Sequence, residues 1–95
     1  MTEWSLKKTW SEMTVKVLYK ASVRRDLRKI DRRNIERILR KIGNVLGDNP
    51  KSGEPLHGEF AGLYKLRIGD YRVIYALLER DVLVLRIRHR SIAYQ

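Results

Sequence analysis

Two alternating segments joined by Gly69-Asp70 restrict the fold of this 95-residue chain more than any other feature. Residues 64–68 and 71–76 each alternate between one row of apolar side chains and a more polar row, which is the period of strands with one buried face. A two-residue connection with glycine first is typical of a tight hairpin turn, and such a turn fixes the register of the two strands. The predicted cross-strand pairs are Ile68 with Tyr71, Arg67 with Arg72, Leu66 with Val73, and Lys65 with Ile74.

Two helices are predicted ahead of this hairpin, after a first strand. Residues 15–19 alternate as a short strand that ends near Ala21, and Ser22 is placed to cap a first helix. That helix carries apolar residues at positions i, i+4 and i+7, namely Val23, Leu27 and Ile30. Asp31 is placed to cap a second helix with one apolar stripe. The stripe consists of Ile35, Ile38, Leu39, Ile42 and Leu46.

The remaining elements complete one α+β domain. The second helix ends before Pro50, residues 51–58 are predicted to form a loop, and residues 82–89 a last strand. The order is therefore β-α-α-β-β-β, in a largely antiparallel sheet with the helical hairpin packed on one face. Residues 15–95 are predicted to be this single domain, and residues 1–14 an amino-terminal extension.

Charge and composition limit the classes of function. Lys and Arg number 21 against 11 Asp and Glu, a net charge of +10, so we expect a polyanionic partner, either nucleic acid or an acidic protein. Cysteine is absent, and two histidines cannot supply the ligands of a typical zinc site, so we expect no disulfide, metal or cofactor. No apolar run is long enough to span a membrane and the start lacks a signal-peptide pattern, which predicts a cytoplasmic protein.

One face of the predicted sheet gathers positive charge. If the apolar rows, including Leu85 and Ile87, face the helices, six cations share the opposite face. They are Lys65, Arg67, Arg72, Arg86, Arg88 and Arg90. Like charges directly opposite each other destabilise paired strands by a few tenths to about 1 kcal/mol. The face is either a solvated surface of long side chains or an anion site, and the opposed Arg67 and Arg72 favour the anion site.

RNA suits this face chemically. Arginine binds phosphate oxygens through two hydrogen bonds and stabilises developing negative charge, and Arg86 and Arg88 are candidate substrate contacts. A lysine among cations is harder to keep protonated, which favours its use as a base. The 2′-hydroxyl of RNA can cleave its own strand without a metal when a base, cationic support and a proton donor are supplied. Tyr94, beyond the last strand, is placed to stack on a nucleobase.

Several motifs from residue 56 onward are distinctive in combination. They are Leu56-His57-Gly58, Gly62-Leu63-Tyr64-Lys65-Leu66-Arg67, Gly69-Asp70-Tyr71-Arg72-Val73-Ile74-Tyr75, and Arg88-His89-Arg90 with Tyr94. Together they resemble the RelE/ParE superfamily of toxin–antitoxin toxins, over a stretch that runs from about Val15 to the end. The resemblance implies a RelE-like ribonuclease fold, whose size and order of elements agree with those predicted above.

The resemblance also implies roles for individual residues on the basic face. Lys65 corresponds to a family lysine proposed as the general base, and Arg67 stands where RelE has a second lysine. Arg72 corresponds to the arginine that supports the transition state. Arginine in place of lysine at position 67 keeps the positive charge but cannot act as a base in the same way.

The family's remaining residues correspond to the end of the chain. Arg90 corresponds to an arginine assigned as general acid or phosphate ligand, although a gap in the comparison allows Arg88 to take that place. Tyr94 corresponds to a carboxy-terminal tyrosine that orients or stacks on the substrate. Some ribosome-dependent relatives use instead a glutamate in a Glu-Pro-Leu loop with a late histidine, and Glu54-Pro55-Leu56 with His89 resembles that arrangement in part.

The function implied is that of a toxin of a type II toxin–antitoxin system. A RelE-type member is a metal-independent, ribosome-dependent mRNA endoribonuclease that inhibits translation, with the ribosome, mRNA and a cognate antitoxin as partners. ParE-type members inhibit DNA gyrase on the same fold and generally lack the full basic set, so the alternative is a gyrase inhibitor without nuclease activity. A third interpretation is a basic fold whose remaining site no longer cuts RNA.

Overall fold

Within the residues that the structure describes, 15–89, the chain forms a five-stranded sheet with two α-helices on one face. This computed structural model leaves the predicted extension, residues 1–14, and the tail that holds Arg90 and Tyr94 outside the described residues. The elements are β1 (Val17–Tyr19), α2 (Ala21–Leu27), α3 (Arg32–Asp48), β2 (Glu54–Pro55), a 3-10 turn η1 (Gly58–Phe60), β3 (Leu63–Ile68), β4 (Tyr71–Leu77) and β5 (Val82–His89).

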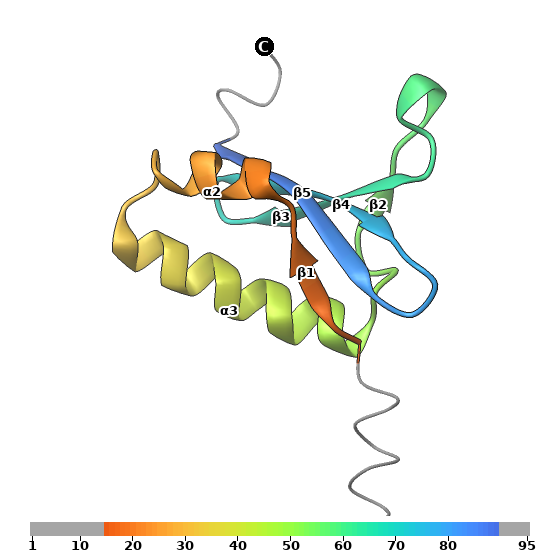
Figure 1. Ribbon diagram of the computed structural model, residues 1–95, viewed down its shortest axis with the longest axis horizontal. Coiled ribbons are helices and arrows are strands. Elements are labelled where there is room, and N and C mark those ends of the chain that lie inside the picture. The colour runs from red at the N-terminus through yellow and green to blue at the C-terminus, as the bar shows by residue number, and fades with distance from the viewer. Residues whose placement is uncertain (1–14, 90–95) are drawn as a thin grey trace, which may run out of the picture.

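The sheet has the order β1-β5-β4-β3-β2, with β1 parallel to β5 and the other neighbours antiparallel. In Figure 1, α3 lies on one side of the sheet, and the segment that contains η1 rises on the other side. The predicted fold is confirmed, with one addition: the expected loop 51–58 contains the short strand β2, which pairs with β3. Pro55 is tolerated there because β2 is an edge strand.

The β3–β4 hairpin has the predicted register in full, including Arg67 opposite Arg72. Gly69 has φ +59°, a conformation that side-chain-bearing residues rarely adopt. The turn residue therefore explains why this register was readable from the sequence.

The core lies between this sheet and the helices. The stripe of α3 contributes Ile38, Ile42 and Leu46, each 0% exposed, against Val73 and Tyr75 of β4 and three residues of β5. Burial of one such side chain contributes roughly 1.5–3 kcal/mol, so this layer contributes the main stabilising free energy.

The helix ends differ from the prediction in three respects. Ser22 does not cap α2, because the helix begins at Ala21. The Ser22 Oγ donates instead to the carbonyl of Leu85 at 2.7 Å. Asp31 does occupy the N-cap position of α3, but its carboxylate accepts from Asn34 Nδ2 at 2.6 Å rather than from the helix backbone. Ile30 lies beyond the end of α2 because a tight turn bond to the carbonyl of Leu27 closes the helix, although the side chain remains buried.

Helix α2 takes the place of a missing strand along part of β5. β1 pairs with Val82–Val84, and among residues 15–89 no strand pairs with the outer edge of β5 beyond that point. There the hydroxyl of Ser22 donates a hydrogen bond to the carbonyl of Leu85, and the carboxylate of Asp26 accepts one from the N–H of Ile87 at 2.9 Å. Two helix side chains thus satisfy backbone groups that a strand would otherwise pair with.

Candidate functional site

Three arginines lie side by side across the face of the sheet opposite α3. Arg72 on β4 is the cross-strand partner of Arg67 on β3 and of Arg88 on β5. Neighbouring strands are about 4.8 Å apart, so the three side chains leave the sheet close together. Arg67 is exposed, Arg88 is half-buried, and Arg72 is only 7% exposed. We call these residues the arginine row.

A second row lies next to the first and contains Lys65, Ile74 and Arg86, which are cross-strand partners in turn. At its end β2 places Glu54 opposite Lys65, and the carboxylate Oε2 is 3.4 Å from the Lys65 Nζ. The side chain of Glu54 is 71% exposed, so this ion pair is a weak surface contact. Lys65 is therefore at once a member of the basic face and the partner of a carboxylate.

A groove of about 470 Å³ runs over both rows. Its lining combines four of the predicted cations with apolar residues. The lining residues are Leu56, Phe60, Leu63, Lys65, Arg72, Ile74, Leu85, Arg86 and Arg88. Phe60, in η1, is 55% exposed, which leaves an aromatic ring at the surface beside the cations. The site is thus an open, basic groove with an apolar part, a surface suited to a strand that has both charged phosphates and flat bases.

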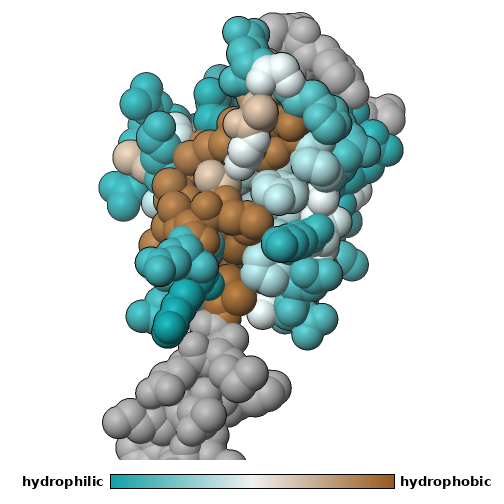
Figure 2. Space-filling view, turned by 90° about the vertical axis from the view of Figure 1, so that its right-hand side faces the viewer, coloured by the Kyte–Doolittle hydropathy of each residue, from teal (hydrophilic) through white to brown (hydrophobic). Residues whose placement is uncertain are grey.

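Apolar side chains reach the surface at other points too. Leu18 is 44% exposed and Leu78 is 43% exposed. Figure 2 shows brown apolar side chains gathered in a band between teal polar side chains on the side of the molecule to the right in Figure 1. The surface is therefore not uniformly basic.

A β-bulge in β5 brings two consecutive residues to the groove. Ile74 pairs with Arg86 and Tyr75 with Val84, so Leu85 is an extra residue in β5. Leu85 was predicted to face the helices, and this prediction is wrong because Leu85 lines the groove together with Arg86. Val84 and Ile87, on either side of the bulge, both face the core. Without the bulge, strict alternation would have placed Arg86 on the core side of the sheet together with Val84, instead of in the groove.

Arg86 is tied to α2 by a bidentate ion pair. Its Nε and Nη2 each donate to the carboxylate of Asp26 at 2.9 Å, and these bonds raise the pKa of Arg86. Burial raises the pKa of Asp26, but bonds from Arg86 and the Ile87 N–H, with the charges of Arg86 and Arg88, outweigh it and hold that pKa below its usual value. Arg86 therefore lies on the predicted face but is already paired with a carboxylate.

The ring of Tyr75 fixes the loop that carries Glu54. Tyr75 is fully buried, its hydroxyl donates to the carbonyl of Pro50 at 2.8 Å, and it accepts from the N–H of Gly53 at 2.9 Å. A Cβ at Gly53 would be 2.5 Å from that hydroxyl oxygen and 2.8 Å from the carbonyl oxygen of Lys65. Only glycine allows this close approach, which places Glu54 beside Lys65.

The structure brings most of the predicted site residues together. Lys65, Arg72, Arg86 and Arg88 line the groove, and Arg67 lies beside Arg72 in a smaller hollow of about 100 Å³ at the hairpin turn. Arg90 and Tyr94 are outside the described residues. The partial resemblance to a glutamate and late-histidine pair is not supported by proximity, because Glu54 on β2 and His89 on β5 are separated by two strands.

Sequence reasoning missed Asp26 and the hydroxyl of Tyr75. A signal for Asp26 was present: it follows Val23 by three residues and precedes Ile30 by four, which is the spacing of a buried helix face. Nothing in the sequence indicated the loop that Tyr75 holds, because its partners are backbone atoms. Within residues 15–89 no group of three acidic or histidine side chains is placed to hold a metal ion, and no helix there has the length and apolarity to cross a membrane.

Comparison with known proteins gives a consistent family. Residues 17–94 match the family described as the ParE toxin of the type II toxin-antitoxin system parDE. The chain is 30% identical over 86 residues to the toxin RelG of Mycobacterium tuberculosis, a match that covers 87% of this chain and 99% of RelG. It is also 32% identical over 78 residues to the toxin RelE of the same organism, covering 79% of this chain and 80% of that toxin.

Solved structures of related proteins have the same architecture. The crystal structure of the toxin-antitoxin complex RelBE2 from Mycobacterium tuberculosis matches with a TM-score of 0.76 and 31% identity, over 82% of this chain and 93% of that one. YafQ from Escherichia coli matches with a TM-score of 0.66 over 85% of this chain and 99% of that one, but at 16% identity the likeness is one of fold alone.

Proposed function

The chain belongs to the RelE/ParE family of toxins of type II toxin–antitoxin systems, and we propose that it is a ribosome-dependent mRNA endoribonuclease that inhibits translation. Cleavage would use the 2′-hydroxyl of the RNA and no metal. A base removes the proton of that hydroxyl, its oxygen attacks the phosphorus, and the 5′-oxygen leaves with a proton. The products are a 2′,3′-cyclic phosphate and a 5′-hydroxyl end.

The arginine row is the observation that carries this proposal. Three guanidinium groups in adjacent cross-strand positions repel one another, which costs the free protein stability. A phosphodiester bound over the row relieves that repulsion, and the charge that develops on a pentacovalent phosphate increases the attraction further. The row therefore stabilises the transition state more than it stabilises the bound substrate, whose phosphodiester carries a single negative charge.

Individual roles follow from position in the groove. Lys65 is proposed as the base and Arg72 as the main support of the transition state, with Arg67, Arg86 and Arg88 as further phosphate contacts. The ion pair with Asp26 leaves Arg86 a fixed, partly neutralised donor, so its contribution is the smallest of the five. Catalytic roles for Arg90 and Tyr94 stay predictions.

A cognate antitoxin and the ribosome are the proposed partners. RelBE2 of Mycobacterium tuberculosis is a toxin–antitoxin complex, and the related chain in it is 31% identical to this one. The net charge of +10 favours an acidic antitoxin segment and ribosomal RNA alike, with faster association at low salt. Such an activity takes place in the cytoplasm, where the ribosomes are.

A gyrase inhibitor is the second candidate function. The family description that matches residues 17–94 names ParE, and Arg67 replaces a lysine of the RelE-type set. Both observations favour a toxin that keeps the fold without the nuclease activity. The two candidates differ in target, so one pair of assays separates them.

The test is translation in a cell-free extract, with primer extension on the mRNA and a supercoiling assay with DNA gyrase at the same protein concentrations. We expect cuts in ribosome-bound mRNA, and these cuts should persist when a chelator is added under conditions in which the ribosomes stay intact. We expect no loss of supercoiling by DNA gyrase. Intact mRNA combined with inhibited supercoiling would establish the gyrase alternative. Intact mRNA and normal supercoiling would favour the third interpretation, a site that no longer cuts.

A further inference from the structure

The face of the sheet that carries the groove changes from charged to apolar along the strands. Next to the row that contains Lys65 lies a third row of cross-strand partners, which we call the apolar row. It consists of Leu63, Ala76, Leu83 and Leu18. Leu63 lines the groove, whereas Val82 and Val84, on either side of Leu83, are fully buried in the core. The apolar row therefore faces away from α3, on the same side as the cations.

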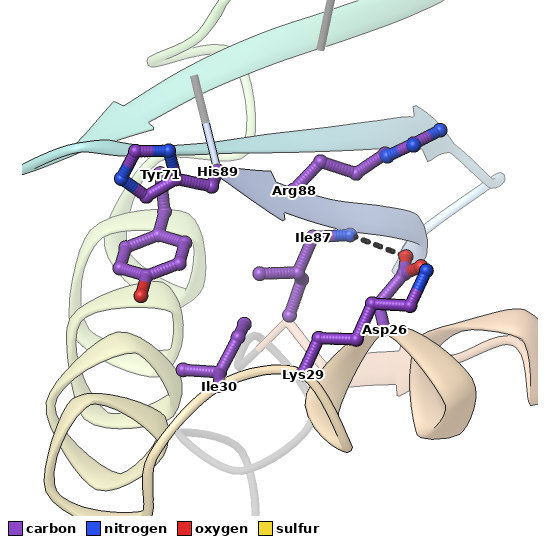
Figure 3. A pocket seen from close by; sticks show the side chains of 7 residues that line it. All are labelled: Asp26, Lys29, Ile30, Tyr71, Ile87, Arg88 and His89. Atoms are coloured by element: carbon purple, nitrogen blue, oxygen red, sulfur yellow. Dashed lines mark hydrogen bonds between the residues drawn. The ribbon is translucent and has the colours of Figure 1, made fainter. Parts of the chain in front are cut away.

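The arginine row forms the charged end of this face. In Figure 3 the side chain of Arg88 extends to the side of β5 opposite Ile87 and Ile30, which point toward the helices. Its guanidinium group therefore belongs to the face that carries the groove, together with that of Arg72.

Each strand passes from cation to apolar side chain in short steps. On β3 the order is Arg67, Lys65 and Leu63, and each step is about 7 Å because a strand rises about 3.4 Å per residue. A ligand that crosses these rows meets first the arginines, then the proposed base, and then an apolar surface.

An aromatic ring lines the apolar end of the groove. Phe60, the last residue of η1, lines it together with Leu56 and Leu63, and is 55% exposed. Its loop is closed at the base by the N–H of Leu56, which donates to the carbonyl of Leu63 at 2.9 Å. Within η1 the N–H of Ala61 donates to the carbonyl of Gly58 at 3.1 Å. Backbone hydrogen bonds therefore support a ring that the core does not bury.

The ribose of RNA presents three groups in the same order as these rows. Its 3′ carbon carries the phosphate that is cut, its 2′ carbon carries the attacking hydroxyl, and its 1′ carbon carries the base. If the phosphate lies on the arginine row and the 2′-hydroxyl at Lys65, the base lies on the side of Lys65 away from the arginines. The groove offers Leu56, Leu63 and Phe60 at that position.

We propose that the ring of Phe60 stacks on the base of the nucleotide that carries the attacking 2′-hydroxyl, with Leu56 and Leu63 beside it. The inference rests on the proposed function and deepens it, because it assigns the base on the 5′ side of the cut to one end of the groove. An aromatic face beside cations is a general means of holding single-stranded nucleic acid. These three side chains have no hydrogen-bonding atoms, so the subsite accepts any base and favours purines, which have the larger stacking surface.

A thermodynamic cycle between one side chain and one base tests the proposal. The probes are dinucleotides whose 5′ nucleoside lacks the 2′-hydroxyl, so they cannot be cut. One probe has adenine at both positions, a second lacks the 5′ base, and a third lacks the 3′ base. Dissociation constants are measured by NMR titration of the full-length protein, labelled at leucine methyl groups. Leu63 reports on the apolar end of the groove, and the buried Leu46 reports on the fold.

Phe60→Ala removes the ring at an exposed position, so the signal of Leu46 should not move. We expect the variant to weaken the intact probe and the probe without the 3′ base at least about fivefold, the lower end of the typical effect of stacking one base. The affinity of the probe without the 5′ base should not change, because that probe has no base to place on the ring. Phe60→Tyr keeps the aromatic face and should bind all probes as the parent does.

Tyr19→Ala is the matched control, because the ring of Tyr19 is 41% exposed and does not line the groove. It should leave all three affinities unchanged. In the parent, cytosine in place of the 5′ adenine should weaken binding, but less than loss of the base does.

An equal loss of affinity for all three probes in Phe60→Ala would overturn the subsite, and so would a Leu63 signal that does not move at saturation. The acidic alternative is a peptide of glutamates with leucine at every third or fourth position. If that peptide shifts Leu63, Leu83 and Leu18 while the dinucleotides leave Leu63 unmoved, the apolar row binds protein and the proposal is wrong. Failure of the proposed function is read separately, from intact mRNA in the primer-extension assay, because the probes measure binding without cleavage.

Discussion

Arg67 and Arg72 are direct cross-strand partners, yet their environments differ sharply: Arg67 is exposed, whereas Arg72 is 7% exposed. Neighbouring side chains cover most of Arg72, so its aliphatic stem contributes packing as well as charge. Truncation of Arg72 to alanine would therefore mix a loss of charge with a loss of packed volume. A test of its catalytic role has to separate the two.

Arg72→Met performs that separation, because methionine fills most of the volume of the arginine stem without the charge. We expect the free energy of unfolding to change by no more than about 1 kcal/mol, since a like-charge neighbour of Arg67 and Arg88 is also removed. Ribosome-dependent cleavage should fall by at least about 10²-fold, the typical effect of removing one preorganised donor. Chemical denaturation and primer extension measure the two quantities.

Arg40→Met is the control for Arg72→Met, because Arg40 is exposed on α3, on the other side of the sheet, and should change neither quantity appreciably. A variant Arg72→Met that unfolds more than about 2 kcal/mol more easily would identify the arginine as structural. Retained cleavage in a stable variant would show that the site lies elsewhere.

Glu54→Gln distinguishes the two residue sets that resemble the family. If Lys65 is the base, loss of the carboxylate 3.4 Å away removes only an exposed ion pair, and cleavage should stay within about twofold of the parent. Lys65→Met should lose at least about 10²-fold. A steep loss in Glu54→Gln with activity retained in Lys65→Met would reverse the assignment. Single-turnover cleavage on programmed ribosomes measures both variants.

The ion pair of Asp26 predicts a loss of stability in acid. Its pKa is lowered in the folded protein, so the carboxylate contributes stability above about pH 4, and this contribution is lost as the pH falls through the folded value. Asp26→Asn should cost about 1–3 kcal/mol at neutral pH, because Arg86 loses its partner. The difference between parent and variant should shrink below about pH 4.

Denaturant unfolding between pH 2 and pH 7 measures this difference. Asp48→Asn is the control, because Asp48 is exposed at the end of α3, and we expect parallel curves for it at every pH. A gap between the parent and Asp26→Asn that stays constant down to pH 2 would contradict the role of the charged carboxylate.

The contact between Gly53 and Tyr75 predicts strong coupling between two substitutions. Gly53→Ala should destabilise the protein by about 1–3 kcal/mol, because the new methyl group meets the tyrosine hydroxyl and the Lys65 carbonyl. Tyr75→Phe should cost about 1–3 kcal/mol through the loss of its bonds to the loop. The double variant should cost less than the sum of both.

Gly43→Ala is the matched control for Gly53→Ala. Gly43 lies within α3 with no atom within 4 Å of an added Cβ, so alanine should stabilise the helix by about 0.5–1 kcal/mol. Thermal or denaturant unfolding of the parent, the two single variants and the double variant completes the double-mutant cycle. Strict additivity of the two Gly53 and Tyr75 changes would refute the steric clash.

The fold was predictable wherever a local pattern determined it. The glycine turn sets the β3–β4 register, and the 3.6-residue stripe sets the buried face of α3. Leu85 escaped prediction because a β-bulge changes the phase of alternation, and a bulge depends on contacts with another strand. Ser22 escaped for a similar reason, since its hydroxyl serves a carbonyl 63 residues away rather than its own helix.

The candidate site was predictable in its charges but not in its pairing. Alternation placed Lys65, Arg67 and Arg72 on one face, as the structure confirms. That Arg86 is held by Asp26, and that Glu54 lies beside Lys65, depends on how distant elements dock. Composition and spacing indicate which side chains reach a surface, whereas their ion-pair partners are decided by tertiary packing.

The contact of α2 with β5 also carries a constraint on length. Ser22 and Asp26 are four residues apart on a helix, which spans about 6 Å, and their partners Leu85 and Ile87 are two residues apart on a strand, which spans about 6.6 Å. The two spacings are nearly equal, so both hydrogen bonds can form at once. A single residue inserted or deleted between the members of either pair would prevent the two bonds from forming at the same time. Among homologues, these two segments should therefore vary in composition while their lengths remain the same.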